Sequence, residues 1–136
     1  MTGGRGPAPP PGLIDTPILV AYREGEPDAV RFVLDIRHVR PPEMSELSAL
    51  ALFAWAYDAS SHMGVQNFLN TADVYALTAP IVHRAYRLLN RIPAPSGLTA
   101  DDALIAATAL AHKLQLYTLD PAKFAGVPNL TAARPY

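Results

Sequence analysis

Short apolar segments that resemble buried strands alternate with longer helical segments along this chain, and no other feature limits its possible folds as much. The clearest strand segments lie at 13–15 and 115–119, and helical patterns flank both of them. Parallel strands need a crossover connection between them, which is usually a helix packed on the sheet. The alternation therefore predicts an α/β fold around a central, mainly parallel sheet.

Helix-start signals, apolar periodicity and turn residues predict the other elements. Thr16 is the expected N-cap of the first helix, and Pro17 its first helical residue. The expected helices span 16–25, 27–36, 43–58, 61–70, 79–92 and 102–113. The expected strands lie at 13–15, 37–40, 73–77, 115–119 and, as an edge strand, from residue 130 onward, with a loop at 93–97 and a turn at 121–124.

The 136 residues, half of them hydrophobic, fit one domain with a real core. Residues 1–12 are rich in Pro and Gly, so we expect a disordered tail without a secretory signal, and one domain over 13–136. No segment reaches the roughly eighteen uninterrupted apolar residues of a membrane span, which predicts a soluble protein with no membrane partner. The absence of cysteine excludes disulfides and thiolate metal sites, and it is compatible with a reducing cytoplasm. A formal charge of −1 provides no bulk attraction to nucleic acid.

Acidic residues stand where strands end and helices begin. Asp15 and Asp120 follow strand segments, and the carboxyl ends of parallel strands meet at one edge of a sheet. Glu46 and Asp102 lie in the first turns of helices whose starts reach the same edge. Clustered carboxylates repel one another, and no basic residue is adjacent in sequence to Asp15, Glu46 or Asp102. We therefore expect a bound Mg²⁺ or Mn²⁺ that activates water and stabilises the leaving oxygen of a phosphodiester, as in metal-dependent nucleases.

Each acid also has a structural interpretation. Acids near helix starts stabilise the N-terminus, and Thr99 with Asp102 could form only a variant of the capping box. Asp120, directly before Pro121, could simply begin a turn. Asp15 lies between two apolar runs, where a solvated surface role is awkward, so the set of acids is a stronger indication than any single member.

The segments LIDTPILVAY, SELSAL, DDALIAATALAHKLQLYTLD and AKFAGVPNL resemble successive blocks of PIN-domain proteins, specifically VapC-type toxins of type II toxin–antitoxin systems. The resemblance covers nearly everything after Gly12. It implies a PIN-like α/β/α sandwich, an Mg²⁺ or Mn²⁺ site and endonucleolytic cleavage of RNA. The catalytic acids that it implies are Asp15, Glu46, Asp102 and Asp120.

Within this set, Asp15, Asp102 and Asp120 would bind the metal directly or through water, and Glu46 would complete the site and position water. Thr16 and Thr118 match supporting hydroxyl positions of the family.

Three positions depart from the family pattern. Glu43 stands where the family often has Thr, Asp101 duplicates the third acid, and Lys123 replaces an acid or histidine. We prefer Glu46 to Glu43 because a leucine follows it, and Asp102 to Asp101 because it directly precedes ALIAATAL. Glu43 and Asp101 would then cap their helices.

Two groups of basic residues are candidates for RNA contact. Arg84, Arg87 and Arg91 share one helix face at i, i+3 and i+7, although such a stripe is more often only solvated. Arg37, His38 and Arg40 form a second patch with the same ambiguity. The histidines show no paired spacing for a zinc site.

The segment LSALALFAWAYDA is apolar around most of its helical circumference. Either it is deeply buried, which is the default, or Phe53, Trp55 and Tyr57 face a partner. The resemblance to VapC toxins implies a homodimer and a VapB-like antitoxin, whose C-terminal segment occupies an apolar groove near the acids.

The leading hypothesis is an Mg²⁺- or Mn²⁺-dependent endoribonuclease that acts as the toxin of a VapBC-type pair. The alternative is a catalytically silent PIN-like interaction module whose acids are only caps. A phosphatase with Asp15 as nucleophile is disfavoured, because Pro17 stands where such enzymes place a second aspartate.

Overall fold

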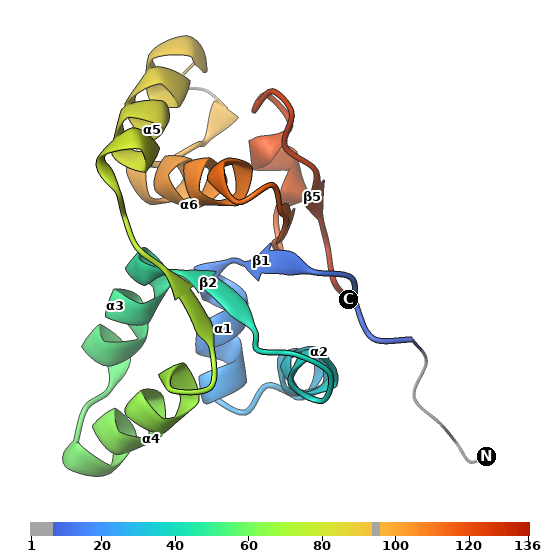
Figure 1. Ribbon diagram of the computed structural model, residues 1–136, viewed down its shortest axis with the longest axis vertical. Helices are drawn as coiled ribbons and strands as arrows, with labels where there is room; N and C mark the ends of the chain where they lie inside the picture. Colours follow the sequence, from blue (N-terminus) through green and yellow to red (C-terminus); the bar gives the residue numbers. More distant parts are fainter. Residues whose placement is uncertain (1–6, 94–95) are drawn as a thin grey trace.

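The computed structural model describes residues 7–93 and 96–136 as a parallel five-stranded sheet with helices on both faces (Figure 1). The strands are β1 (Gly12–Ile14), β2 (Glu43–Ser45), β3 (Asp73–Tyr75), β4 (Gln115–Tyr117) and β5 (Ala132–Ala133). The α-helices are α1 (Thr16–Arg23), α2 (Pro27–Arg37), α3 (Glu46–Trp55), α4 (Ala59–Leu69), α5 (Ala79–Arg91) and α6 (Ala100–Ala111), and a 3₁₀ helix, η2, spans Pro121–Phe124. The strand order is β3-β2-β1-β4-β5, with β1 in the centre.

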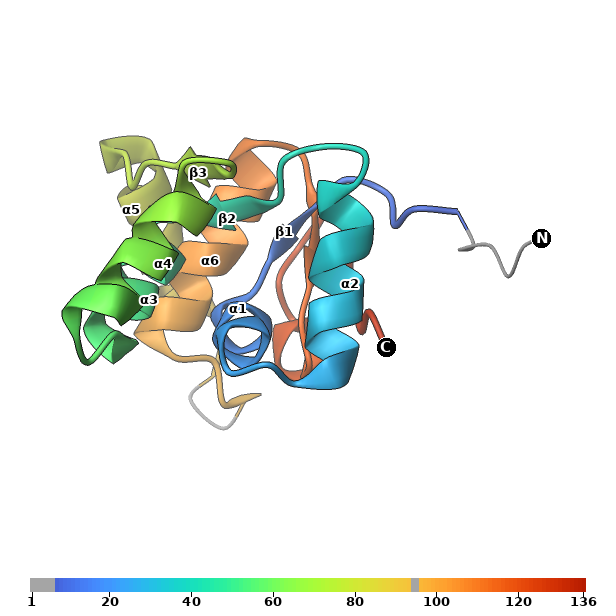
Figure 2. The ribbon, with the colours of Figure 1, turned by 90° about the horizontal axis from the view of Figure 1, so that it is seen from below.

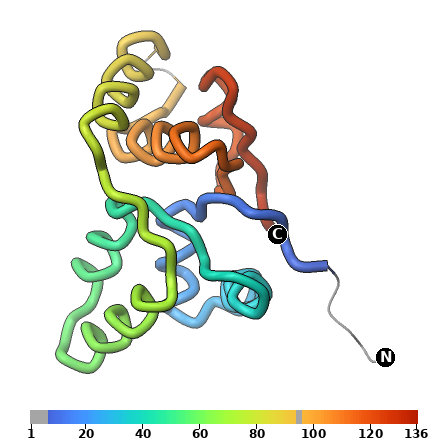
Figure 3. Tube along the Cα trace, viewed as in Figure 1, coloured from blue at the N-terminus to red at the C-terminus, as the bar shows by residue number. Residues whose placement is uncertain are grey.

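Neighbouring residues of the central strands point into two separate cores. Ile14 and Tyr117 pack with α1 to α4, whereas Leu13 and Leu116 pack with α5, α6 and η2. In Figure 1, α1 to α4 lie below β1 and α5 and α6 lie above it, and in Figure 2, seen from below, α1 to α4 are in front. Helix α5 packs against α6. Figure 3 traces the crossing from the first group to the second after β3. The predicted α/β/α sandwich is confirmed.

Several predicted boundaries were wrong for local physical reasons. Asp15, not Thr16, is the N-cap of α1, because its carboxylate accepts a hydrogen bond from the Thr16 amide. The strand expected at 37–40 is instead the end of α2 and a turn. Pairing begins after two prolines, which lack the amide that a sheet needs, so Glu43–Ser45 forms β2 and the expected helix 43–58 shortens to Glu46–Trp55.

The tail expected at residues 1–12 lies partly outside the described residues, since 1–6 are not described. Gly12 opens β1 and pairs with Gln115 of β4. The Pro10 carbonyl accepts a hydrogen bond from the Tyr117 hydroxyl at 2.6 Å, and the Pro9 carbonyl accepts one from Arg40. Of the loop expected at 93–97, residues 94 and 95 are likewise outside the described part. Within that part, no helix has both the length and the apolarity needed to cross a membrane.

Candidate functional site

Asp15 lies at the carboxyl end of the central strand β1, where it is almost fully buried, with 2% of its surface exposed. The Asp15 amide donates to the Tyr117 carbonyl at 2.9 Å and so continues the pairing of β1 with β4. The Thr16 amide donates to Asp15 Oδ1 at 2.9 Å, and the Thr118 hydroxyl donates to Oδ2 at 2.8 Å. A hydrogen bond to each oxygen therefore fixes the orientation of the Asp15 carboxylate.

Asp102 lies in the first turn of the neighbouring helix α6 and is also buried, with 6% of its surface exposed. Its amide donates to Thr99 Oγ1 at 3.1 Å, and its Oδ2 accepts from the Thr99 amide at 3.0 Å. The capping box that the sequence indicated is thus present. It uses one oxygen of the carboxylate and leaves Oδ1 for another partner.

That partner is Lys123, which sequence reasoning missed. Its Nζ lies 3.1 Å from Asp102 Oδ1, and the Lys123 side chain is 25% exposed. The only signal in the sequence was that Lys123 replaces an acid or histidine of the family pattern. Its neighbour Phe124 is buried in the core and anchors η2. A cation of the chain itself therefore lies among the acids, although none is adjacent to them in sequence.

Asp15, Asp102 and Lys123 are coupled electrostatically. Burial raises the pKa of Asp15 above its ordinary value, while the hydrogen bonds from Thr118 and Thr16 lower it. The negative charge of Asp102 raises this pKa further, and the ammonium group of Lys123 lowers it. Asp15 and Asp102 are thus close enough to repel each other, and Lys123 offsets part of that repulsion.

The two threonines expected to support the site differ in what they touch. The Thr118 hydroxyl contacts Asp15 and also accepts a hydrogen bond from the Asp120 amide at 3.2 Å. The Thr16 hydroxyl instead bonds to Ser48 Oγ at 2.7 Å, so Thr16 reaches Asp15 only through its backbone.

Glu46 and Asp120 are both exposed at the surface. Glu46 Oε1 accepts a hydrogen bond from the Leu77 amide at 3.1 Å. Throughout 7–93 and 96–136, no three Asp, Glu or His side chains are grouped so that they could hold one metal ion. The structure brings Asp15 and Asp102 together, but it does not add Glu46 or Asp120 to them as a third ligand.

The two alternative acids have different surroundings. Glu43 belongs to β2 and accepts a hydrogen bond from the Tyr75 hydroxyl at 2.5 Å, so it does not cap a helix. Asp101 is exposed in the first turn of α6.

Asp15 and Asp102 suit a hard divalent cation in part. Mg²⁺ is commonly held by one or two carboxylates, with waters and substrate phosphates completing its shell. Two buried carboxylates that repel each other match that requirement. The ammonium of Lys123 already occupies one oxygen of Asp102, so a dication would share or displace that contact.

A groove of about 710 Å³ opens beside the two aspartates, with α1 and α3 along its walls. Asp15, Asp101 and Asp102 line the groove together with the apolar side chains of Leu50 and Trp55. Leu50 is 59% and Trp55 65% exposed, and Tyr57 is also exposed, whereas Phe53 packs against the core. The default expectation of burial was therefore wrong for Trp55 and Tyr57.

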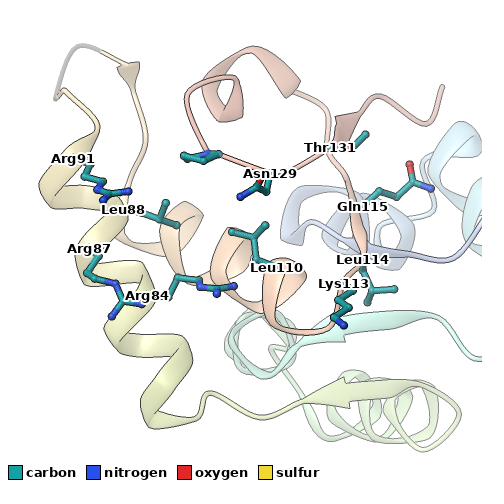
Figure 4. Close-up of a pocket in the computed structure, with 11 residues that line it drawn as sticks. Arg84, Arg87, Leu88, Arg91, Leu110, Lys113, Leu114, Gln115, Asn129 and Thr131 are labelled. Atoms are coloured by element: carbon teal, nitrogen blue, oxygen red, sulfur yellow. The ribbon is translucent and has the colours of Figure 1, made fainter.

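The two groups of basic residues that were candidates for RNA contact have different surroundings. Arg37 lies over the Phe68 ring at 5.5 Å and donates to the Tyr22 hydroxyl at 2.9 Å. Arg84, Arg87 and Arg91 instead line a cavity between α5 and the end of α6 (Figure 4). Neither group lines the groove beside Asp15 and Asp102.

Comparison with known proteins identifies the family. The PIN-domain family model matches residues 12–130. A chain of a toxin–antitoxin complex from Klebsiella pneumoniae is 25% identical, with a TM-score of 0.74, covering 92% of this chain and 98% of that one. No curated protein matches this chain.

Two further solved structures, with lower identity, share the fold. They are VapBC2 from Rickettsia felis bound to a promoter DNA fragment (18% identity, TM-score 0.70) and VapBC-1 from nontypeable Haemophilus influenzae (17%, 0.73). In both, 90% of this chain and 96% of the other chain are covered. The family model spans most of the sequence, and the solved structures have the same architecture as the VapC-type resemblance implied. The chain belongs to the PIN-domain family.

Proposed function

We propose that this protein is a divalent-metal-dependent endoribonuclease and the toxin of a VapBC-type toxin–antitoxin pair. PIN-domain proteins are generally nucleases and typically depend on divalent metals. The observation that carries the proposal is the buried pair of Asp15 and Asp102 at the carboxyl end of the sheet. Burying two acids that repel each other is costly, and a cation that binds both would offset the cost.

Asp15 and Asp102 would hold Mg²⁺ or Mn²⁺. Such an ion would lower the pKa of a bound water and stabilise charge on the phosphodiester. The Thr118 hydroxyl and the Thr16 amide fix the Asp15 carboxylate, and the capping box fixes Asp102. These contacts keep both acids oriented before any ligand arrives, which lowers the cost of binding.

Lys123 would have two roles beside the two aspartates. Its ammonium group favours the charged form of Asp15 and so offsets part of the rise in pKa that burial causes, and it pairs directly with Asp102. With one face toward solvent, it can also donate a hydrogen bond to a phosphate oxygen of a bound RNA.

Glu46 and Asp120 stay predictions as catalytic acids, and Asp120 also as a metal ligand. Both are exposed near elements that end or begin at this edge, so they could act on water or substrate without sharing the ion. Single substitutions of Glu46→Gln and Asp120→Asn would measure their contributions separately.

The expected partner is a VapB-like antitoxin, whose segment would lie in the apolar groove. An exposed wall containing Leu50 and Trp55 leads to Asp101 and Asp102, which suits an amphipathic segment with a basic residue at its end. The Klebsiella pneumoniae relative is itself part of a toxin–antitoxin complex. A homodimer, also implied by the resemblance, is part of the same proposal.

The central test is RNA cleavage by the purified protein with Mg²⁺ or Mn²⁺, and with EDTA as a negative control. Asp15→Asn and Asp102→Asn should each lower the rate about a hundredfold or more, since they remove charge where it develops in the reaction. Asp28→Asn, at an exposed site on α2, is a matched control with the same loss of charge. Equal cleavage by all folded variants, or full activity in EDTA, would contradict the proposal.

One observation favours the silent-module alternative. Lys123 already pairs with Asp102, and the capping box gives this acid a structural role. If Mn²⁺ leaves the melting temperature unchanged and no RNA is cut, the module interpretation replaces the nuclease.

A further inference from the structure

A second hollow, at a different place from the acids, is lined by positive charge. It has a volume of about 600 Å³ and lies between α5, the end of α6 and the segment before β5 (Figure 4). Arg84, Arg87 and Arg91 reach it from α5, and Lys113 reaches it from beyond the end of α6. No acidic residue lines this cavity, which we call the basic cavity.

The four cations of the basic cavity are not paired with any acid in the part of the chain that the structure describes. In residues 7–93 and 96–136, no carboxylate lies within salt-bridge distance of any of them, in contrast to Lys123. Four like charges around one hollow repel one another, and an anion from outside would relieve that repulsion. Guanidinium groups offer paired donors that match the oxygens of a phosphate.

The floor of the basic cavity is apolar, formed by Leu88, Leu110 and Leu114. Sites for single-stranded nucleic acid combine cations for the backbone with a surface against which a base packs, which is most often aromatic and is aliphatic in this cavity. The volume also falls in the range of pockets that hold small organic ligands. A nucleotide would use both features, with its base on the leucines and its phosphate at the arginines.

The backbone around the basic cavity is left-handed at two non-glycine residues. Among the described residues, the only non-glycine residues with positive φ are Lys113 (56°) and Asn129 (67°), and both line this cavity. Lys113 follows the C-cap of α6, a position that usually belongs to glycine. A lysine is less favoured than a glycine at this position, and left-handed residues of this kind are enriched at ligand sites.

The basic cavity and the buried aspartates lie at opposite ends of α6. Asp102 is in the first turn of this helix, and Lys113 comes directly after its C-cap, about 16 Å away along the helix axis. A phosphate in the basic cavity is therefore not the one that Asp15 and Asp102 of the same subunit could reach.

We infer that the basic cavity binds a nucleotide of a single-stranded RNA, several nucleotides away from the bond cut at Asp15 and Asp102. That the bound strand is the substrate rests on the proposed function, whereas binding itself does not. An acidic protein segment would also meet the cations, but its carboxylates make no use of the apolar floor.

The test measures the binding of a fluorescein-labelled oligouridine by anisotropy in EDTA, so that no cleavage contributes. Arg87→Gln with Arg91→Gln removes two exposed cations of the basic cavity. The control variant, Arg23→Gln with Arg31→Gln, removes two exposed cations from α1 and α2. Its net charge is therefore the same as that of the cavity variant. The cavity variant should bind the oligouridine about tenfold more weakly. The magnitude of its slope of log binding constant against log salt concentration should fall by about 1.4. The control variant should change neither quantity appreciably.

Equal weakening by both pairs, or none by either, would overturn the inference. So would displacement of the RNA by polyglutamate at an equal concentration of charge, since the cavity would then favour an acidic protein. The cleavage assay remains a separate readout. Loss of oligouridine binding by the cavity variants in a protein that cuts no RNA would refute the nuclease proposal and support the cavity as a binding site.

Discussion

The two ends of α6 differ in how far the fold neutralises their charged side chains. At its start, the buried carboxylates of Asp15 and Asp102 are held by hydrogen bonds and by one internal cation, Lys123. At its end, the cations of the basic cavity face a hollow without any acid in its lining. The first end has its charges partly neutralised within the fold, whereas the second depends on water or on a ligand. A clear charge pattern in the sequence therefore does not reveal which charges are already paired.

The strongest test of this contrast substitutes one lysine at each end. Lys123→Met leaves the Asp102 carboxylate buried without its partner, so the metal-free protein should lose about 1–3 kcal/mol of unfolding free energy. Lys113→Met removes an exposed charge that has no acidic partner among the described residues, and its effect should stay within about 0.5 kcal/mol. Urea unfolding in EDTA measures both variants.

Equal losses for the two methionine variants would mean that Lys123 is no more involved in the fold than a surface lysine. The contrast between the two ends would then disappear.

The sequence predicted the layered fold and the pair Asp15 and Asp102, because both depend on local patterns. The alternation of strands and helices implied a parallel sheet, and short connections then place Asp15 and the start of α6 at one edge. Likewise, Thr99 and Asp102 are three residues apart, so their capping box was visible in the sequence.

The contacts of Lys123 could not be predicted in the same way. It meets Asp102 across 21 positions of sequence only because Phe124 anchors η2 against the core. The positive φ angles of Lys113 and Asn129 are also set by tertiary context, since neither residue is a glycine that would signal them. The strand Glu43–Ser45 was missed because three residues carry too little periodicity to separate it from a helix start.

A second prediction asks whether a metal can replace the internal cation. In Lys123→Met, Mn²⁺ would find Asp102 Oδ1 without its ammonium partner, so saturating Mn²⁺ should raise the unfolding free energy by about 1 kcal/mol more than in the unchanged protein. Calorimetric titration with Mn²⁺ should likewise give a lower Kd for the variant. A higher Kd would indicate that Lys123 helps to form the metal site rather than competing for it.

The basic end allows a smaller test, in which stability and binding move in opposite directions. Lys113→Gly removes the strain of a positive φ at the end of α6 and should stabilise the protein by up to about 1 kcal/mol. The same change removes one cation, so oligouridine binding should weaken about threefold. Asn129→Gly is the matched control, because it places a glycine at the other left-handed position of the same cavity without loss of charge. Should Lys113→Gly leave oligouridine binding unchanged, the charge of Lys113 would make no contribution to binding at the basic cavity.

The smallest effect is expected from Asp101, the acid next to the buried pair. It is exposed in the first turn of α6, where its charge interacts with the helix dipole and contributes about 0.5 kcal/mol or less. Asp101→Asn should therefore change the unfolding free energy little, and it should reduce RNA cleavage far less than Asp102→Asn does. The two variants remove the same charge from adjacent residues, so only burial and partners distinguish them. If both lower cleavage equally, the total negative charge at the start of α6 matters more than the oriented carboxylates, and Lys123 becomes a general counterion rather than the specific partner of Asp102.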